Sequence, residues 1–201
     1  MEVVCLDLEG VLVPEIWIAF AERTGIQELR LTTREVPDYD VLMRSRIRIL
    51  REHGLKLRDI QDVISTIRPL DGAKDFLDEL RSLTQVIILS DTFREFASPL
   101  MRQLGWPTIF CNSLVVDGEG TITGFTLRQN DGKRKAIEHL RGMGFRTFAA
   151  GDSYNDLTMI ACADSGCLFR APENILLEHP QLHLSTTYDD FMKTIRRFVD
   201  G

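Results

Sequence analysis

The chain has 201 residues, 44% of them hydrophobic, and its 24 basic and 30 acidic residues give a net charge of −6. This length can bury one substantial core and a smaller satellite domain. The acidic balance gives no electrostatic argument for binding nucleic acid or an anionic membrane, so an anionic substrate would need local positive charge or a metal.

The first element predicted along the chain is a buried strand. It is the apolar run Val3-Val4-Cys5-Leu6, which stops at Asp7, and Gly10 then allows the backbone to turn. Two helical stretches follow, in which apolar residues recur at helical spacing between charged ones: residues 16–31 and 41–67. Proline and glycine end this helical insertion at residues 68–72.

Beyond residue 72 the pattern becomes an alternation of helices and strands. Helices are predicted over residues 73–83, 94–104, 133–141, 156–163 and 189–199. Strands are predicted over residues 85–89, 108–111, 146–150 and 166–169. Residues 114–124 contain two alternating segments around an Asp-Gly-Glu-Gly turn, which is typical of a β-hairpin. Strands separated by helices indicate an α/β fold with a parallel sheet covered on both faces, and the helical insertion would form a lid over the strand ends.

The cysteines and the apolar runs bear on where the protein works. No CxxC spacing occurs, and the cysteines lie in or near apolar segments, as reduced and buried thiols do in cytosolic proteins: Cys5, Cys111, Cys162 and Cys167. No apolar run approaches the roughly 20 residues of a membrane span, and the amino terminus lacks the pattern of a signal peptide or lipid anchor. We therefore expect a cytoplasmic protein that binds neither nucleic acid nor membrane.

Two acidic segments follow predicted strands. Asp7-Leu8-Glu9-Gly10 comes after the first strand, and Gly151-Asp152-Ser153-Tyr154-Asn155-Asp156 comes after the strand at 146–150. A lone aspartate in such a place is most often a turn former. Because ligands of open parallel sheets bind at the carboxyl ends of the strands, the two segments together predict a shared cation site.

Four segments occur in the order of the motifs of the haloacid dehalogenase superfamily: Asp7-Leu8-Glu9-Gly10-Val11, Leu89-Ser90-Asp91, Lys133 and Gly151-Asp152 with Asn155-Asp156. The chain resembles the phosphoserine phosphatase branch of that superfamily over nearly all its length, since the helical insertion and the hairpin also match. The resemblance implies a Rossmann-like, three-layer α/β core with a parallel sheet and a β-hairpin, formed by residues 1–14 and 69–201. Residues 15–68 would be a small helical-bundle cap that sets substrate specificity.

The resemblance also implies a mechanism through an aspartyl phosphate. Asp7 would be the nucleophile, and Glu9 would be the general acid and base. Mg²⁺ would be held by the carboxylates of Asp7 and Asp152 and by the main-chain carbonyl of Glu9. Lys133 and Ser90 would contact the phosphate oxygens. Asn155 would contact the phosphate or a metal-bound water, with Asp156 as the partner of the lysine.

Two of these assignments have alternatives. Ser90 also suits the N-cap of the following helix. Lys133 competes with Arg134 and Lys135, which are as typical of a solvated helix surface.

Two further residues match the substrate-binding positions of that branch. Glu15 corresponds to the residue that binds the ammonium group, and Arg46 to the one that holds the carboxylate. Together they imply an amino acid, and the planar fork of arginine donates two parallel hydrogen bonds to a carboxylate. However, four arginines between residues 44 and 51 are equally typical of a solvated helix face. The histidines lack metal-binding spacing and suit the surface or packing: His53, His139, His179 and His183.

Three departures from the usual pattern of the branch are visible. Glu9 stands where most members have aspartate. Asp91 stands where glycine is common, and it adds a carboxylate beside the phosphate. We count Asp91 among the expected substrate-binding residues. The chain between Asp7 and Glu15 is one residue shorter than usual. These features resemble a bacterial bifunctional subgroup that hydrolyses phosphoserine and passes its phosphoryl group to homoserine. Any hydroxyl that the pocket orients can attack an aspartyl phosphate.

The sequence therefore predicts a Mg²⁺-dependent phosphoserine phosphatase with phosphoserine:homoserine phosphotransferase activity, serving serine and threonine biosynthesis. Its partners would be L-phosphoserine and, as acceptor, homoserine. The alternatives are a phosphatase of the same fold for another small phosphomonoester and a non-catalytic phosphate-binding module. The sequence does not fix the oligomeric state, and a homodimer stays open.

Overall fold

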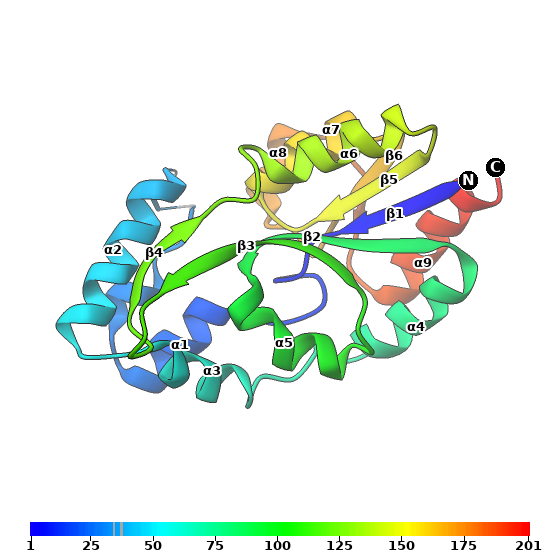
Figure 1. The fold of residues 1–201 in the computed structure, drawn as a ribbon. Helices are drawn as coiled ribbons and strands as arrows, with labels where there is room; N and C mark the ends of the chain where they lie inside the picture. Colours follow the sequence, from blue (N-terminus) through cyan, green and yellow to red (C-terminus); the bar gives the residue numbers. More distant parts are fainter. Residues whose placement is uncertain (34, 37) are drawn as a thin grey trace.

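The computed structural model describes residues 1–33, 35–36 and 38–201, which form a layered α/β fold (Figure 1). Within these residues the sheet has seven strands in the order β4-β3-β2-β1-β5-β6-β7. They are β1 (Glu2–Leu6), β2 (Gln85–Phe93), β3 (Thr108–Val116), β4 (Ile122–Thr126), β5 (Arg146–Gly151), β6 (Ser165–Phe169) and β7 (Leu184–Ser185). Neighbouring strands are parallel except β3 and β4, which are antiparallel. The predicted α/β class, parallel sheet and hairpin are thus confirmed.

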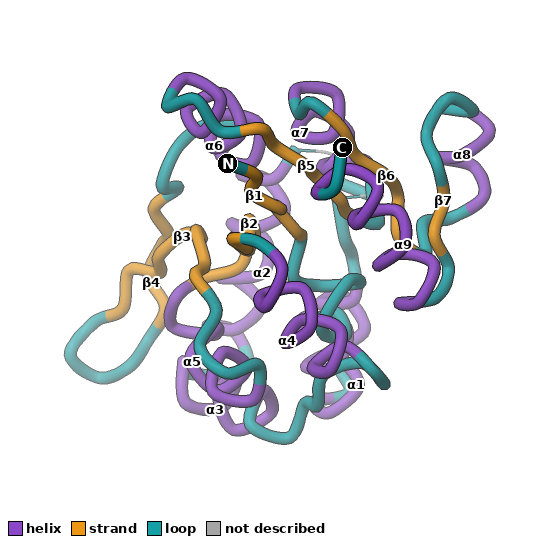
Figure 2. The backbone as a smooth tube through the Cα atoms, turned by 90° about the vertical axis from the view of Figure 1, so that its right-hand side faces the viewer, coloured by secondary structure: helices purple, strands orange, loops and turns teal. Residues whose placement is uncertain are grey.

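Helices cover both faces of this sheet (Figures 1 and 2). One face carries α6 (Gly132–Gly142) and α7 (Leu157–Cys162), and the other carries α4 (Ala73–Leu83), α5 (Arg94–Gln103) and α9 (Tyr188–Val199). The central strand β1 alternates between the two cores: Val3 and Cys5 face one, and Val4 and Leu6 face the other. Because both faces are buried, β1 is apolar throughout instead of alternating with polar residues.

The helical insertion lies at one end of the molecule, beside β4 and α5 (Figure 1). It consists of α1 (Ile16–Thr24), the 3-10 helix η1 (Gln27–Arg30), α2 (Tyr39–Glu52) and α3 (Leu57–Ile64). Each of the two predicted helical stretches is divided near a glycine in the left-handed region, Gly25 at φ 75° and Gly54 at φ 63°. Hydrogen bonds from Leu57 to the β3-β4 turn and from Gln61 to α5 tie α3 to the core.

Several elements differ from the sequence-based expectation. The patterns missed α8 (Glu173–Glu178), β7 and the 3-10 helix η2 (Tyr154–Asp156) because such short elements show no readable period. The predicted strand at 108–111 and the first hairpin arm are one strand, β3, which pairs with β2 and then with β4. The four cysteines are free thiols, and Cys5 and Cys167 are buried as predicted, whereas Cys111 and Cys162 are only partly buried.

No helix among the described residues has the length and apolar character needed to cross a membrane.

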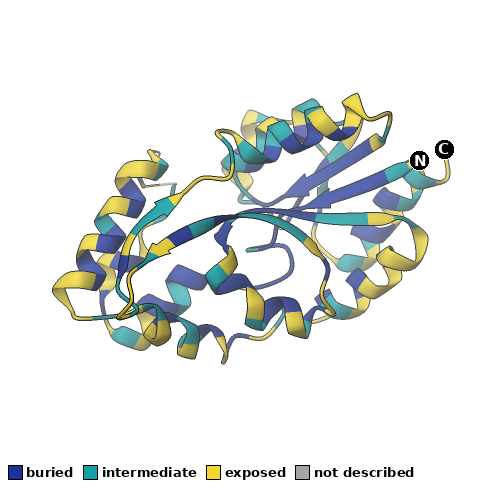
Figure 3. Cartoon of the chain, viewed as in Figure 1, coloured by how far each residue is buried: buried dark blue, intermediate teal, exposed yellow. Residues whose placement is uncertain are grey.

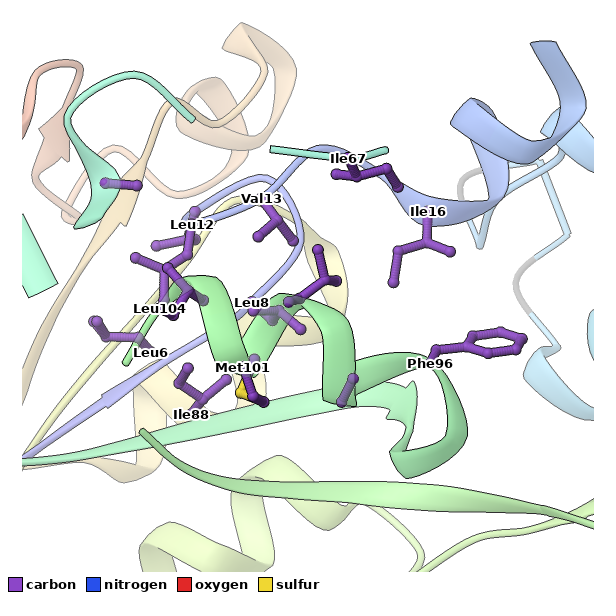
Figure 4. Close-up of a cluster of buried hydrophobic side chains, with 14 of the residues drawn as sticks. Leu6, Leu8, Leu12, Val13, Ile16, Ile67, Ile88, Phe96, Met101 and Leu104 are labelled. Atoms are coloured by element: carbon purple, nitrogen blue, oxygen red, sulfur yellow. The ribbon is translucent and has the colours of Figure 1, made fainter. Parts of the chain in front are cut away.

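The turn that follows β1 is anchored by apolar side chains. Leu8, Leu12 and Val13 are fully buried, and Figure 4 shows them in one cluster with Leu6 and Ile88. Burying a leucine side chain contributes about 1.5–3 kcal/mol. These contacts hold the polar residues of the turn at the end of β1, in a region that Figure 3 colours as buried.

Candidate active site

The carboxyl ends of β1 and β5 lie side by side. In their parallel register Leu6 pairs with Ala150, and the Asp7 N–H donates to the Ala150 carbonyl at 3.0 Å. Asp152 directly follows β5 at the same edge of the sheet. Carboxylate oxygens of Asp7, Asp152 and Asp156 lie within 4.8 Å of one another. The parallel pairing therefore brings together the two acidic segments that are far apart in the sequence.

Two glycines allow the carboxylates to approach the backbone this closely. Gly10 has a φ of +78°, and a Cβ there would lie 2.3 Å from Asp152 Oδ2. A Cβ at Gly151 would lie 2.1 Å from Asp156 Cγ. A larger residue at either position would displace a carboxylate, so the geometry of the site requires glycine at both.

Lys133 is 5% exposed and faces these carboxylates. Its Nζ lies 2.9 Å from Asp7 Oδ1 and 2.7 Å from Asp156 Oδ1. Burial alone would lower the pKa of Lys133, but Asp156 and Asp7 outweigh burial and hold this pKa well above its usual value. The alternatives, Arg134 and Lys135, form ion pairs with a glutamate on the outer side of α6. Of the three, Lys133 is the one that enters the acidic cluster.

The acidic cluster suits a cation. Burial and then Asp156 raise the pKa of Asp7 well above its usual value, although Lys133 opposes the shift. Asp156 is already committed, because its Oδ1 accepts from Lys133 and its Oδ2 accepts from the backbone N–H groups of Asp152 and Ser153 at 3.0 and 3.1 Å. Asp7 and Asp152 offer two further carboxylates at the same place, and hard oxygen ligands of this kind suit Mg²⁺.

The Glu9 carbonyl belongs to the same turn. The backbone bonds of this turn run from Gly10 N–H to the Val13 carbonyl and from Leu12 and Val13 N–H to the Leu8 carbonyl. The Glu9 carbonyl takes no part in these bonds. The donor set expected from the sequence, two carboxylates and one carbonyl, therefore has the chemistry that a magnesium site needs.

The Glu9 carboxyl lies at the start of α1, where its Oε2 accepts the Ile16 N–H at 2.8 Å. Burial, and then the neighbouring Glu15 carboxylate, raises the pKa of Glu9 to about 8. A carboxyl with this pKa carries a proton at neutral pH and can give it to a reacting oxygen. Glu9 therefore has the protonation state that a general acid needs.

Arg46 is buried, whereas its neighbours Arg44 and Arg48 pair with acidic residues on the helix surface. The Arg46 guanidinium carbon lies 4.5 Å from the centroid of the Trp17 ring, and its Nη2 donates to the Leu31 carbonyl at 2.7 Å. Burial lowers the pKa of Arg46 to about 10, so it stays charged at neutral pH. Its Nε is buried and has no hydrogen-bond partner among the described residues. Such a group can bind an anion that enters the pocket.

Ser90 and Asp91 lie near the end of β2. Phe93 is the cap residue of α5, so Ser90 does not cap that helix. Asp91 Oδ2 accepts from Asn155 Nδ2 at 2.9 Å and lies 3.9 Å from Lys133 Nζ. The carboxylate that replaces the usual glycine is thus held between two groups expected to contact phosphate.

One pocket gathers nearly all the residues selected from the sequence: Asp7, Glu9, Glu15, Arg46, Ser90, Asp91, Lys133, Asp152 and Asn155. Asp156 contacts it through Lys133. The sequence reasoning missed the other lining residues: Trp17, Thr32, Thr33, Tyr39, Leu42, Thr92, Phe93 and Ser153. Tyr39 and Trp17 matter most among these, since the Tyr39 hydroxyl donates to the Asp91 carbonyl at 2.8 Å and Trp17 lies under Arg46. No histidine is among the lining residues that the structure describes.

Comparison with known proteins gives consistent matches. A family model of haloacid dehalogenase-like hydrolases matches residues 1–164. The chain is 58% identical to phosphoserine phosphatase ThrH of Pseudomonas aeruginosa, over 96% of this chain and 94% of that protein. It is also 58% identical to a phosphoserine phosphatase of Pseudomonas syringae pv. tomato, over 96% and 81%. A phosphoserine phosphatase of Methanocaldococcus jannaschii is 26% identical over 79% and 80%.

Solved structures share the fold. A phosphoserine phosphatase in apo form superposes with a TM-score of 0.74 at 23% identity, covering 91% of this chain and 92% of that one. A phospho-aspartyl intermediate analogue of phosphoserine phosphatase gives a TM-score of 0.75 at 22% identity, covering 96% and 97%. At such identities these matches establish the fold and leave the substrate to be argued from the site.

Proposed function

The chain belongs to the haloacid dehalogenase-like hydrolases, and we propose that it is a Mg²⁺-dependent phosphoserine phosphatase that also transfers the phosphoryl group to homoserine. One observation carries the proposal: the buried Arg46 guanidinium, with its unpartnered Nε, lines the same pocket as the Asp7–Lys133 pair. The pocket thus has one end suited to a carboxylate and another suited to a phosphate. The 58% identity to two phosphoserine phosphatases supports the same substrate.

In the first step an Asp7 carboxylate oxygen attacks phosphorus, and the bond between phosphorus and the serine oxygen breaks. Glu9 gives its proton to that oxygen, so serine leaves as a neutral alcohol. Lys133 and Ser90 donate hydrogen bonds to the phosphoryl oxygens. Asp7, Asp152 and the Glu9 carbonyl would hold Mg²⁺, which would supply positive charge to offset the repulsion between the carboxylate and the phosphate.

In the second step a hydroxyl attacks the aspartyl phosphate. Glu9, now a carboxylate, takes the proton of the attacking hydroxyl, and the bond between phosphorus and Asp7 breaks. Water gives inorganic phosphate, and homoserine gives phosphohomoserine. Both reactions regenerate the same free enzyme, so the second activity needs no further catalytic group.

The amino-acid end of the pocket selects the substrate. Glu15 binds the ammonium group, and Arg46 binds the carboxylate through parallel hydrogen bonds. Both residues belong to the segment 15–68, which we propose acts as the specificity cap, whereas Asp7 and Lys133 belong to the core formed by 1–14 and 69–201. Homoserine carries the same ammonium and carboxylate groups as serine, so the same contacts orient it as an acceptor. The homodimer remains a prediction from the sequence.

The proposal is tested by measuring phosphate release from L-phosphoserine with Mg²⁺, with and without homoserine, while phosphohomoserine is followed by mass spectrometry. Phosphohomoserine should appear as free phosphate falls, because both acceptors compete for one phosphoenzyme. The Asp7→Asn variant is the control and should form neither product. Phosphate release that homoserine leaves unchanged would refute the transferase part. A preference for sugar phosphates over phosphoserine would refute the amino-acid pocket.

A further inference from the structure

The turn that carries Glu9 is held from outside by two carbonyl contacts. The Leu12 carbonyl accepts the Leu70 N–H at 2.9 Å, and the Val11 carbonyl accepts the Tyr188 hydroxyl at 2.7 Å. Tyr188 begins α9, 177 positions away from Val11 in the sequence. A side chain from the far end of the chain therefore fixes a peptide group two residues after Glu9.

The Tyr188 ring has little freedom to move. It stacks on Phe76 of α4 with centroids 5.0 Å apart, and on Phe169 of β6 with centroids 4.9 Å apart. The Arg170 guanidinium carbon lies 4.9 Å from its centroid. A Cβ on Gly72 would lie 3.2 Å from the ring, so the chain passes closely over it there. These contacts aim the hydroxyl at a fixed point.

Tyr188 also touches both places where the chain crosses between the core and the helical insertion. Val11 lies shortly before the insertion begins, and Gly72 lies shortly after it ends. The Tyr188 hydroxyl holds the first crossing, and its ring packs against the second. A displacement of this side chain would therefore reach the turn that bears Glu9.

We propose that Tyr188 is a positioning residue that acts through Glu9: its hydroxyl fixes the Val11 carbonyl and so holds the turn that presents the Glu9 carboxyl to the leaving oxygen. This inference rests on the proposed function, in which Glu9 is the general acid. Burial raises the pKa of Tyr188 to about 12, which keeps the hydroxyl a neutral donor at working pH. A shift of about 1 Å in a catalytic group can cost about a hundredfold in rate, so a modest loosening is measurable.

The test uses Tyr188→Phe, which removes only the hydroxyl and keeps the ring stacking. We expect kcat/KM for L-phosphoserine to fall about tenfold or more, while kcat/KM for p-nitrophenyl phosphate falls less than threefold, because nitrophenolate leaves without a proton. Thr194→Val is the control on the same helix: it removes a hydroxyl that donates to the Asp190 carbonyl, away from the pocket, and both substrates should keep wild-type kinetics. Equal loss on both substrates, or no loss on either, would overturn the proposal.

A double-mutant cycle tests the route through Glu9. In single-turnover phosphorylation by phosphoserine, Tyr188→Phe should cost less than about twofold in a Glu9→Gln background, because the group it positions is gone. A full tenfold cost in that background would overturn the proposal. The wild type is assayed first, so that this outcome can be distinguished from failure of the proposed function. If the proposed function is wrong, the wild type itself will show no activity on phosphoserine.

Discussion

Arg46 offers the sharpest separation of substrate recognition from phosphoryl transfer. Arg46→Ala removes the guanidinium that is expected to hold the substrate carboxylate and leaves the Asp7–Lys133 end of the pocket unchanged. Removing one partner of a buried, hydrogen-bonded charge pair costs about 2–5 kcal/mol. At about 1.4 kcal/mol per factor of ten, kcat/KM for phosphoserine should fall by roughly 30-fold to several thousand-fold.

The same variant should affect an aryl phosphate little, because that substrate has no carboxylate to bind. The assay is therefore the ratio of kcat/KM values for L-phosphoserine and p-nitrophenyl phosphate, which should fall by at least about 30-fold. Arg46→Lys keeps the charge but loses the planar fork, and we expect it to lie between the alanine variant and the wild type.

Arg46 also supports the fold through Trp17 and the Leu31 carbonyl, so its removal will lower stability. Arg48→Ala on the same helix is the control, since Arg48 pairs with the exposed Glu52 and should change stability by less than about 0.5 kcal/mol. Thermal melts should accompany each assay. An equal loss of activity on both substrates in Arg46→Ala would refute carboxylate recognition and leave Arg46 with a structural role alone.

Changes to the acidic residues test the remaining roles. Asp152→Asn should abolish the stabilisation by Mg²⁺ that we expect in thermal melts of the wild type, which is about 2.7 kcal/mol at a hundred times Kd. Stabilisation by Mg²⁺ that persists in Asp152→Asn would contradict the metal assignment. Asp156→Asn should lower the free energy of unfolding by about 3 kcal/mol, because it takes from buried Lys133 its nearest carboxylate; urea denaturation that shows a loss below about 1 kcal/mol would contradict this. Because the pKa of Glu9 is raised to about 8, its acid form dominates below pH 8. The rate at which phosphoserine phosphorylates the enzyme, measured by rapid quench, should therefore decline above pH 8. In the Glu9→Gln variant this rate should lose its pH dependence.

The sequence contained more information about the site than motif order alone. On α6 the buried residues are Lys133, Ala136, Ile137 and Leu140, a helical stripe that includes Lys133 and excludes Arg134 and Lys135. On α2 the buried stripe likewise includes Arg46 and excludes its arginine neighbours: Leu42, Met43, Arg46, Ile47, Ile49 and Leu50. A charged residue on an apolar stripe is thus a signal that periodicity provides. It distinguishes a pocket residue from a solvated face without any family resemblance.

Other parts of the site could not be predicted because they depend on how separate elements pack. Trp17 is one of several apolar residues in α1, and only the tertiary arrangement of α1 and α2 brings its ring under Arg46. The contact of Tyr39 with the Asp91 carbonyl joins residues 52 positions apart. The fold class itself was predictable, because buried strands alternating with amphipathic helices allow few other arrangements.

The charge of the pocket would give a bound Mg²⁺ a role in binding as well as in chemistry. Among the described lining residues five carboxyl groups face two cations: Asp7, Glu9, Glu15, Asp91 and Asp152 against Arg46 and Lys133. With Glu9 protonated, these groups leave a deficit of about two positive charges, which one divalent cation would cancel. A phosphomonoester dianion entering without the metal would meet net repulsion, in keeping with the acidic chain as a whole. We therefore expect loss of Mg²⁺ to weaken binding of the substrate and not only to slow its turnover. Equilibrium dialysis of a phosphonate analogue of phosphoserine, which cannot be hydrolysed, against the wild type with and without Mg²⁺ would separate these effects, and equal binding in both would contradict the expectation.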